Sequence, residues 1–366
     1  MRFGEGAPYN EGVRIGTRRG AAAAAILVLL LLAAVGGGGR ALAQSAPANQ
    51  TIPVGTSPFV RIRVRRGNVT IRTWDRKEVH VESSSDVDAK HFDARAVASG
   101  LHGDLPIFAA TVQTPDGPMT LSPETFSLAS VPQGDHDAVD VQGGDDGSDV
   151  TITVPSSTAL VIAHVGGGRL TLENYHNGTF VTRVRGGAVI LRNVSGTGFA
   201  ETMRGPVVAL DSTFERIRAR SAAGNVFFER CTSRQIEVTT LSGNVVYDNG
   251  SFVPGLARFE SQSGAIALGV ASSDVRIDAH SGNGKVLTSF DRHADVVTPA
   301  AGETQATFGG ARSIVTANSA ANSVYLYDGS IRNHQRLSGE WNPLRSIVNR
   351  HHAPPMPHPH PFPRRR

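Results

Sequence analysis

A glycine-centred pattern recurs through the second half of the chain every 18 to 21 residues, and it limits the folds that the chain can adopt. In each copy an apolar residue follows the glycine after two positions, and a second one usually follows after four. Apolar residues also stand five and seven positions before most of these glycines. A period of two indicates strands with one buried face. Each copy therefore predicts a strand, a tight turn and a second strand. The turn glycines are Gly168, Gly187, Gly205, Gly224, Gly243, Gly264 and Gly284.

A single unit of this length cannot bury its own apolar face. Stacked units can, because neighbouring strands pair about 4.8 Å apart and equivalent residues then form a continuous core. We therefore predict an all-β fold, a single-stack, β-helix-like β-solenoid of two-strand coils of about 19–21 residues. An antiparallel β-sandwich also has short strands and regular turns, but it does not explain a pattern that is fixed on both sides of the glycine.

A row of hydroxyl residues accompanies the repeat, three positions before the glycine. Its members are Thr202, Ser221, Thr240, Ser261, Ser281 and Ser319. Hydroxyl groups at such positions satisfy the backbone groups of a turn. We expect a structural role for this row rather than a catalytic one.

The formal net charge of +4 comes from the two ends of the chain. Arginines are concentrated in the first 43 residues and in the last 17, and the chain between them is slightly acidic. A nucleic-acid surface needs a basic patch on the folded part. The charge distribution therefore argues against nucleic acid as a partner.

Residues 1–43 have the features of a secretory signal peptide. Arginines precede the apolar run 21–35, and an A-x-A site ends at Ala43, directly before Gln44. The run is shorter than the roughly 20 residues of a membrane span. We expect cleavage between Ala43 and Gln44 and no stable membrane span afterwards, with an uncleaved anchor as the alternative. Arg18 and Arg19 leave twin-arginine export open beside the general secretory route.

The chain has a single cysteine, Cys231, which excludes an intrachain disulfide. We expect Cys231 to be a small buried apolar residue within the repeats. An exported chain of this kind is held together by its own packing. The expected location is the periplasm, the cell surface or the extracellular space.

After the signal peptide the chain divides into five predicted segments. They are an N-terminal β segment that starts the solenoid (44–82), an acidic inserted loop that is partly disordered (83–149), the solenoid repeats (150–328), a candidate C-terminal cap (329–350) and a disordered His/Pro/Arg tail (351–366). Within the repeats we expect residues 289–311 to form a longer loop between two coils.

One stretch near the start of the repeats resembles a known family. It reads GNVTIRTWD, and later copies follow the pattern S/T-x-x-G, as at residues 221–224. This is similar to the bacterial "putative adhesin" family, an exported β-strand-repeat domain of unknown function. The family motif corresponds here to Gly67, Val69, Ile71, Trp74 and Asp75. The resemblance covers about residues 58–82 and 150–328. It implies an exported β-repeat fold and supplies no catalytic residues.

Acidic residues recur at the end of the strand that follows the glycine, at Glu173, Glu229 and Asp248, and Arg192 lies in the coil after Glu173. Two carboxyl groups about 5–9 Å apart would suit the cleavage of a glycosidic bond. However, no histidine or lysine accompanies these acids as a partner for proton transfer. We therefore interpret them as turn-edge residues that face water, with Glu173 and Arg192 as a surface ion pair.

Two other patterns bear on metals. Residues 143–150 loosely resemble a calcium-binding nonapeptide repeat, but one copy cannot complete the oxygen cage. His351, His352, His358 and His360 lie in a proline-rich tail, which gives no fixed ligand geometry. Nucleophile motifs and phosphate-binding loops are absent from the sequence. We therefore predict no catalytic residue, no cofactor and no metal site.

The leading hypothesis is an exported, non-enzymatic β-solenoid that serves as an adhesin or as a structural or binding protein of the cell envelope. Its partner would be a polysaccharide, an envelope surface or a protein that contacts one face of the solenoid. The first alternative is a polysaccharide lyase or hydrolase on a β-helix. The second is a self-assembling envelope scaffold whose coils stack end to end.

Overall fold

The computed structural model describes residues 49–83, 92–97, 105–107, 110–114, 117–121, 124–126, 136–144, 147, 149–272 and 274–331. These residues belong to one compact unit that begins at Ala46. Every regular element in them is a strand, so the all-β class is confirmed. None of the described residues forms a helix long and apolar enough to cross a membrane. The predicted signal peptide with its Ala43–Gln44 cleavage site and the tail 351–366 lie outside the described residues.

The described residues form 26 strands in chain order. The first ten are β1 (Asn49–Pro53), β2 (Phe59–Arg66), β3 (Val69–Trp74), β4 (Glu78–Ser83), β5 (Phe92–Val97), β6 (Leu105–Ile107), β7 (Ala110–Thr114), β8 (Gly117–Leu121), β9 (Glu124–Phe126) and β10 (Ala138–Gly143). The next nine are β11 (Val150–Pro155), β12 (Leu160–Glu173), β13 (Gly178–Arg192), β14 (Ser195–Arg204), β15 (Val207–Leu210), β16 (Thr213–Ser221), β17 (Val226–Glu229), β18 (Thr232–Thr240) and β19 (Val245–Ser261). The last seven are β20 (Ile266–Val270), β21 (Val275–Ser281), β22 (Val286–Ser289), β23 (Asp295–Val297), β24 (Glu303–Phe308), β25 (Ser313–Ser319) and β26 (Val324–Asp328).

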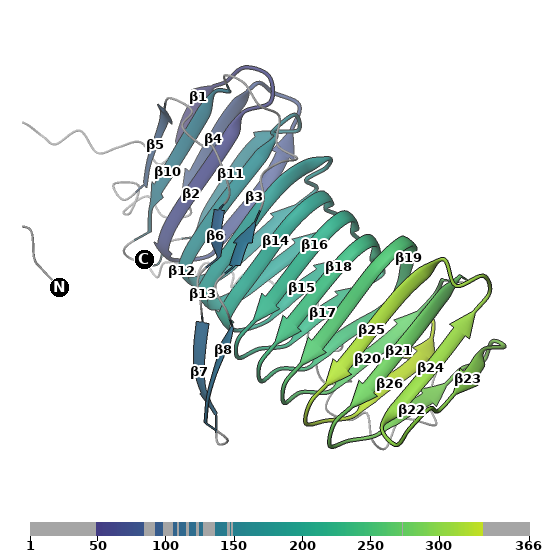
Figure 1. Ribbon diagram of the computed structural model, residues 1–366. Helices are drawn as coiled ribbons and strands as arrows, with labels where there is room; N and C mark the ends of the chain where they lie inside the picture. The colour runs from purple at the N-terminus through teal and green to yellow at the C-terminus, as the bar shows by residue number, and fades with distance from the viewer. Residues whose placement is uncertain are drawn as a thin grey trace, which may run out of the picture. The chain divides into compact units, whose positions relative to one another are not determined.

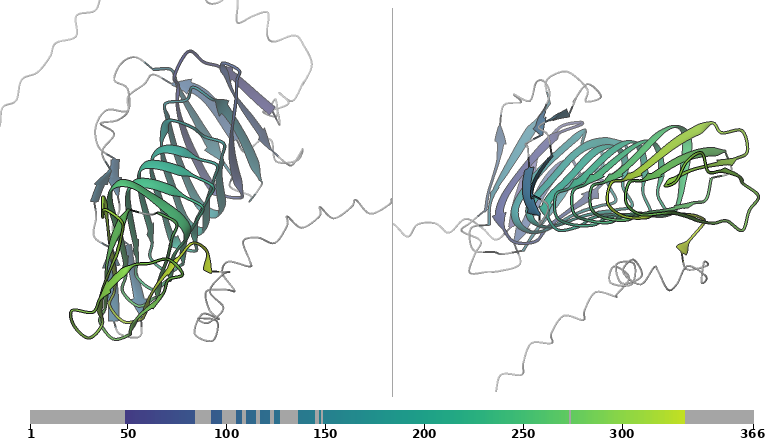
Figure 2. Two further views of the ribbon diagram at one scale, coloured as in Figure 1. Left: turned by 90° about the vertical axis from the view of Figure 1, so that its right-hand side faces the viewer. Right: turned by 60° about the horizontal axis from the view of Figure 1, so that its bottom comes forward.

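Consecutive repeats pair with one another in parallel, so that each coil lies beside the next (Figure 1). The strands before the turn glycines form one wall, which we call the pre-glycine wall. It contains β14, β16, β18, the second half of β19, and β25. The strands after the glycines form the opposite, post-glycine wall. It contains β15, β17, the first half of β19, β20 and β26. Figure 2 shows the two walls facing each other across the interior.

The register keeps equivalent residues together. Val207 pairs with Val226, and Val226 pairs with Val245, each the second residue after its turn glycine. All three side chains are fully buried. The aromatic rings of Phe214, Phe228 and Tyr247 continue the core, with neighbouring centroids 6.2 and 6.1 Å apart. The inward set predicted from the period of two is therefore confirmed. Burial also extends to Cys231 and raises the pKa of its thiol to about 12.

The hydroxyl row has the predicted structural role. The hydroxyl of Thr240 accepts the N–H of Gly243 at 3.0 Å and donates to the carbonyl of Gly224, in the preceding coil, at 3.2 Å. Ser261 repeats both bonds one coil later, with Gly264 N–H at 2.8 Å and the Gly243 carbonyl at 3.0 Å. Each of these two hydroxyls therefore accepts the N–H of its own turn glycine and donates to the turn carbonyl of the preceding coil. These bonds fix the register between coils.

The turn glycines are required by the spacing between coils. A Cβ on Gly224 would lie 2.0 Å from the carbonyl oxygen of Gly205, although the φ of Gly224 is not in the left-handed region. At Gly187 the φ is +150° and the corresponding distance, to the carbonyl oxygen of Gly168, is 1.7 Å. Backbone meets backbone at these turns, and no side chain fits between the coils.

The order of coils in space differs from their order in the sequence at the C-terminal end. β25 lies between β19 and β21, and β26 lies between β20 and β22, all in parallel. The last repeat is thus inserted into the stack. Residues 289–311, which we expected to be a loop, instead contain β23 and β24, and β24 runs antiparallel to β21 at the edge of the wall. The reversal in β24 returns the chain to the inserted position.

At the N-terminal end, too, the order of coils in space differs from their order in the sequence. β2 pairs in parallel with both β12 and β10, so the coil of β10 and β11 lies outside the first one. β10 belongs to the segment 83–149, which we expected to be an inserted loop. Its residues 138–141 are all buried: Val139 and Val141 point into the core, and Ala138 and Asp140 point to the other face. A strand with matching alternation joins the sheet wherever an edge is available, and its position in the sequence does not set its neighbour.

Candidate functional site

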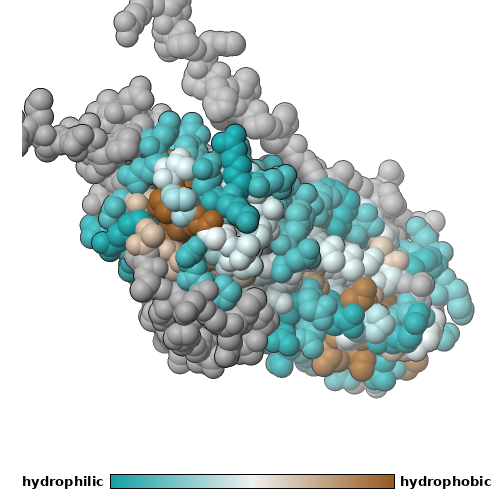
Figure 3. All heavy atoms as spheres, turned by 90° about the horizontal axis from the view of Figure 1, so that it is seen from above, coloured by the Kyte–Doolittle hydropathy of each residue, from teal (hydrophilic) through white to brown (hydrophobic). Residues whose placement is uncertain are grey.

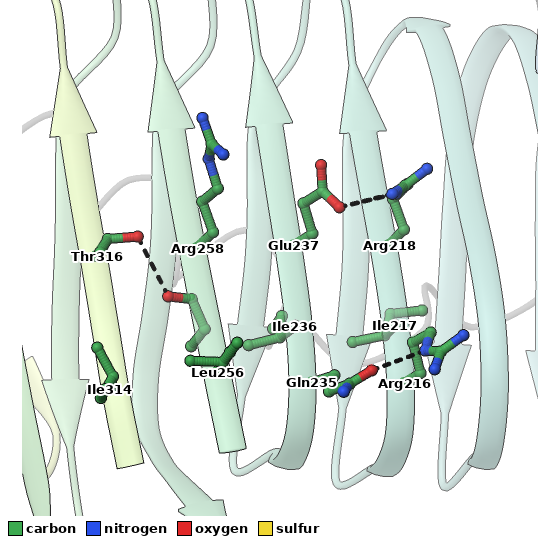
Figure 4. Close-up of a pocket in the computed structure, with 11 residues that line it drawn as sticks. Arg216, Ile217, Arg218, Gln235, Ile236, Glu237, Leu256, Arg258, Ile314 and Thr316 are labelled. Atoms are coloured by element: carbon green, nitrogen blue, oxygen red, sulfur yellow. Dashed lines mark hydrogen bonds and ion pairs between the residues drawn. The ribbon is translucent and has the colours of Figure 1, made fainter. Parts of the chain in front are cut away.

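The outer face of the pre-glycine wall carries an open groove of about 570 Å³. We call it the wall groove. It is lined by Arg216, Ile217, Arg218, Gln235, Ile236, Glu237, Leu256, Ala257, Arg258, Ile314 and Thr316. These residues come from the four adjacent strands β16, β18, β19 and β25 (Figure 4).

The period of two places the polar side chains of the groove on the outer face. In β16, Arg216 and Arg218 flank the buried Ile217, and Gln235 and Glu237 flank the buried Ile236 in β18. The parallel register then aligns these residues from strand to strand. One row is Arg216, Gln235, Leu256 and Ile314, and the next row is Arg218, Glu237, Arg258 and Thr316. A ligand lying across the strands would meet a similar spacing at each step, about 4.8 Å.

The groove is basic and partly apolar. Its lining has three arginines against one glutamate. Arg218 forms an ion pair with Glu237 at 2.8 Å, and Arg258 forms one with Glu260, outside the lining, at 2.5 Å. The Nε–H of Arg216, in contrast, donates to the neutral amide of Gln235 at 2.8 Å. Leu256 is 62% exposed and Ile314 is 43% exposed. Because Arg216 has an amide as its partner, its positive charge is not neutralised within the groove.

Among the described residues, the other large apolar side chains that are exposed are Val296 and Val297, which follow each other in β23. The view in Figure 3 shows mostly hydrophilic residues with separate apolar patches. Single exposed apolar side chains are normal on soluble proteins. The combination in the wall groove is different, because Leu256 and Ile314 are aligned in register and lie beside arginines.

Toward the N-terminal coils the outer face of the same wall is covered, and it contains a column of ionisable residues. His164, Arg183, Glu201 and Arg220 are aligned through β12, β13, β14 and β16. Glu201 and Arg220 are buried, and Arg183 Nε lies 3.5 Å from Glu201 Oε2. Burial, followed by the charges of Arg183, Arg63 and Arg61, lowers the pKa of His164 to about 4. This column could not be predicted from the sequence, because outward polar residues in a strand are normally exposed.

The acidic residues singled out from the sequence have two different environments. Glu173 forms the expected surface ion pair with Arg192 at 3.6 Å and another with Arg72 at 3.5 Å. Glu229 and Asp248, which we expected to face water, are instead buried. They are aligned between β17 and β19.

Asp248 is fully buried and joins the end of the described chain to β19. It accepts hydrogen bonds from the Tyr327 hydroxyl at 2.9 Å, the Ser330 hydroxyl at 3.0 Å and the Ile331 N–H at 2.8 Å. Burial raises its pKa despite these bonds. A carboxylate enclosed in this way is not available to a polymeric substrate, and a structural role explains its position.

The family-motif residues lie at the turn before β3, within β3 and at the turn that follows it. Val69 and Ile71 are core residues, and Gly67 has a φ of +118°. The Trp74 indole N–H donates to the carbonyl of Glu78 at 2.8 Å. Asp75 accepts a bond from the Ser156 hydroxyl at 3.4 Å. The motif thus stabilises the first coil and supplies no reactive group.

The described residues contain no cluster of three or more metal-binding side chains. In the calcium-like run 143–150, part of which lies outside the described residues, Asp149 accepts two hydrogen bonds from Asn68, at 3.0 and 2.8 Å. The four tail histidines lie outside the described residues.

No family model matches the chain. No curated protein matches it either. Among solved structures, one described as a "putative cell adhesion protein" from Clostridium sporogenes has 10% sequence identity and a TM-score of 0.24, over 77% of this chain and 99% of that chain. A likeness this distant carries no argument about function. The resemblance to the adhesin family therefore stays a prediction.

Proposed function

We propose that the chain is an exported, non-enzymatic β-solenoid that binds a polysaccharide of the cell envelope through the wall groove, as an adhesin does. The main observation that supports this proposal is that arginines and exposed apolar side chains are aligned across four parallel strands. A polysaccharide offers repeated hydroxyl and carboxylate groups, and its sugar rings have apolar faces. The two kinds of lining residue suit these two kinds of surface.

The charge of the groove favours an acidic polysaccharide. Arginine forms bidentate bonds with carboxylates, and Arg216 is bonded to an amide rather than to an acid. The alternative of a lyase or hydrolase would need an acid and a base that reach the same ligand. The acidic residue in the groove, Glu237, is held by Arg218, and the buried Asp248 is bonded to three donors.

The test is co-sedimentation of residues 44–366 with envelope and extracellular polysaccharide of the source organism, with released sugar assayed in the same tubes. We expect the protein to pellet without sugar release. Replacing Arg216 and Arg258 together by alanine should weaken binding about tenfold or more, because two charged contacts are lost. The effect should diminish in high salt.

The matched control replaces Arg72 and Arg192 by alanine. These two arginines are 57% and 54% exposed and pair with Glu173, outside the groove. The control should bind like the parent protein. Equal loss in both double variants would point to non-specific charge attraction and would contradict the groove. Sugar release would favour the enzyme instead.

A further inference from the structure

The post-glycine wall has an apolar row on its outer face as well as on its inner one. From Gly187 onward, the row consists of the third residue after the turn of each coil and comprises Ile190, Val208, Phe227, Val246, Ala267, Tyr325 and Leu287. We call it the outer apolar row. Because the neighbours of Phe227 on either side, Val226 and Phe228, belong to the core, Phe227 itself points away from it.

The outer apolar row is nevertheless buried from Val208 to Tyr325, and Ile190 and Leu287 at its two ends are partly buried. Phe227, Val246 and Ala267 have no exposed surface. On the opposite wall the outward Leu256 is 62% exposed, although it belongs to the same strand as Val246. An outward side chain of a two-walled stack reaches zero exposure only beneath a further layer. The post-glycine wall therefore has a cover between β15 and β26.

The described chain leads onto this face where it ends. Ile331 is 3% exposed and belongs to the same apolar cluster as Phe227 and Tyr327. Asp248 holds Ser330 and Ile331 in place through two hydrogen bonds. The chain that continues from Ile331 thus begins directly on the outer apolar row.

We propose that residues 332–350 of this chain are the cover of the outer apolar row. They include Leu337, Trp341, Leu344, Ile347 and Val348, apolar residues that suit such a surface. The distance from β26 to β15 is four strand spacings, about 19 Å. Nineteen residues span about 28 Å even in the shortest regular form, a helix, so the segment is long enough.

The other stretches outside the description attach elsewhere. Undescribed residues also lie between β4 and β10, where they alternate with the described strands β5–β9, and before β1. Strands β4, β10 and β1 pair with β11, β2 and β4, respectively, at the opposite end of the stack. The proposal thus assigns residues 332–350 to the outer face of a wall, rather than to the open end of the stack, and leaves the wall groove as the uncovered face.

The experiment uses the full mature chain with Trp74→Phe, so that Trp341 is the one remaining tryptophan of the two. We expect blue-shifted Trp341 emission and weak quenching by acrylamide. Val246→Lys should expose Trp341, increase quenching several-fold and speed tryptic cleavage within 332–350, because a lysine in the middle of the row displaces the cover. Leu256→Lys, in the same strand but on the other wall, should change none of these.

Because Val246→Lys could fail to fold, a second variant tests the proposal without a change in either wall. Leu337→Asp combined with Leu344→Asp leaves both walls intact and should raise the binding of a hydrophobic dye while the β-type circular dichroism persists. The proposal is overturned if Trp341 is as accessible in the parent as free tryptophan. It is also overturned if the acidic double variant binds no more dye, or if shielding of Trp341 disappears on dilution together with a dimer, which would make a second copy the cover.

Discussion

Replacing Gly187 by alanine is expected to lower the free energy of unfolding by about 3 kcal/mol or more. The new Cβ would lie 1.7 Å from the carbonyl oxygen of Gly168, and the φ of Gly187, +150°, is one that alanine rarely adopts. The obstacle is backbone, so no side-chain rotation relieves it. The two coils must separate locally, which weakens the parallel pairing of β12 with β13 on both sides of the turn.

The adjacent Gly186 provides the control. A Cβ there would lie 3.8 Å from the carbonyl oxygen of Gly166, an ordinary contact. Gly186→Ala should therefore leave stability nearly unchanged or raise it slightly, since alanine restricts the unfolded chain. Urea unfolding of both variants would measure the difference. Similar midpoints for the two variants would show that the coil spacing adapts and would remove our explanation of the turn glycines.

The second large effect is acid destabilisation through His164. Burial and three arginines lower its pKa in the folded chain from 6.5 to about 4. Between these values the unfolded chain binds a proton that the folded chain does not bind. The stability is fully present above about pH 6.5 and is lost as the pH falls toward about 4, by about 3 kcal/mol at most.

His164→Gln should remove this part of the pH dependence, because the replacement does not titrate. His176→Gln is the control, since His176 is exposed. Denaturation at several pH values between 4 and 7 would give the slopes, and NMR titration of the ring would give the pKa directly. A pKa of His164 near 6.5, or an unchanged slope in His164→Gln, would contradict the prediction.

The coil could be predicted from the repeat pattern alone. The offsets of apolar residues from each glycine identify inward residues such as Val226 and Tyr247, and the hydroxyl three positions earlier identifies the bond that Thr240 forms. These features are local: the period of a strand and the geometry of a turn are set within one repeat. Local patterns of this kind can be recognised without knowing the partner strand.

The order of the coils in the stack and the burial of outward residues depend on contacts between segments that are distant in the sequence. Repeats have similar edges, so local pattern does not reveal that β25 lies between β19 and β21. The repeat pattern also does not set how exposed an outward side chain is: Arg216 lines an open groove, whereas Phe227 and Glu201 are buried. Whether an outward side chain meets water depends on chain segments far away in the sequence, and the wall groove could therefore not be predicted from the repeat.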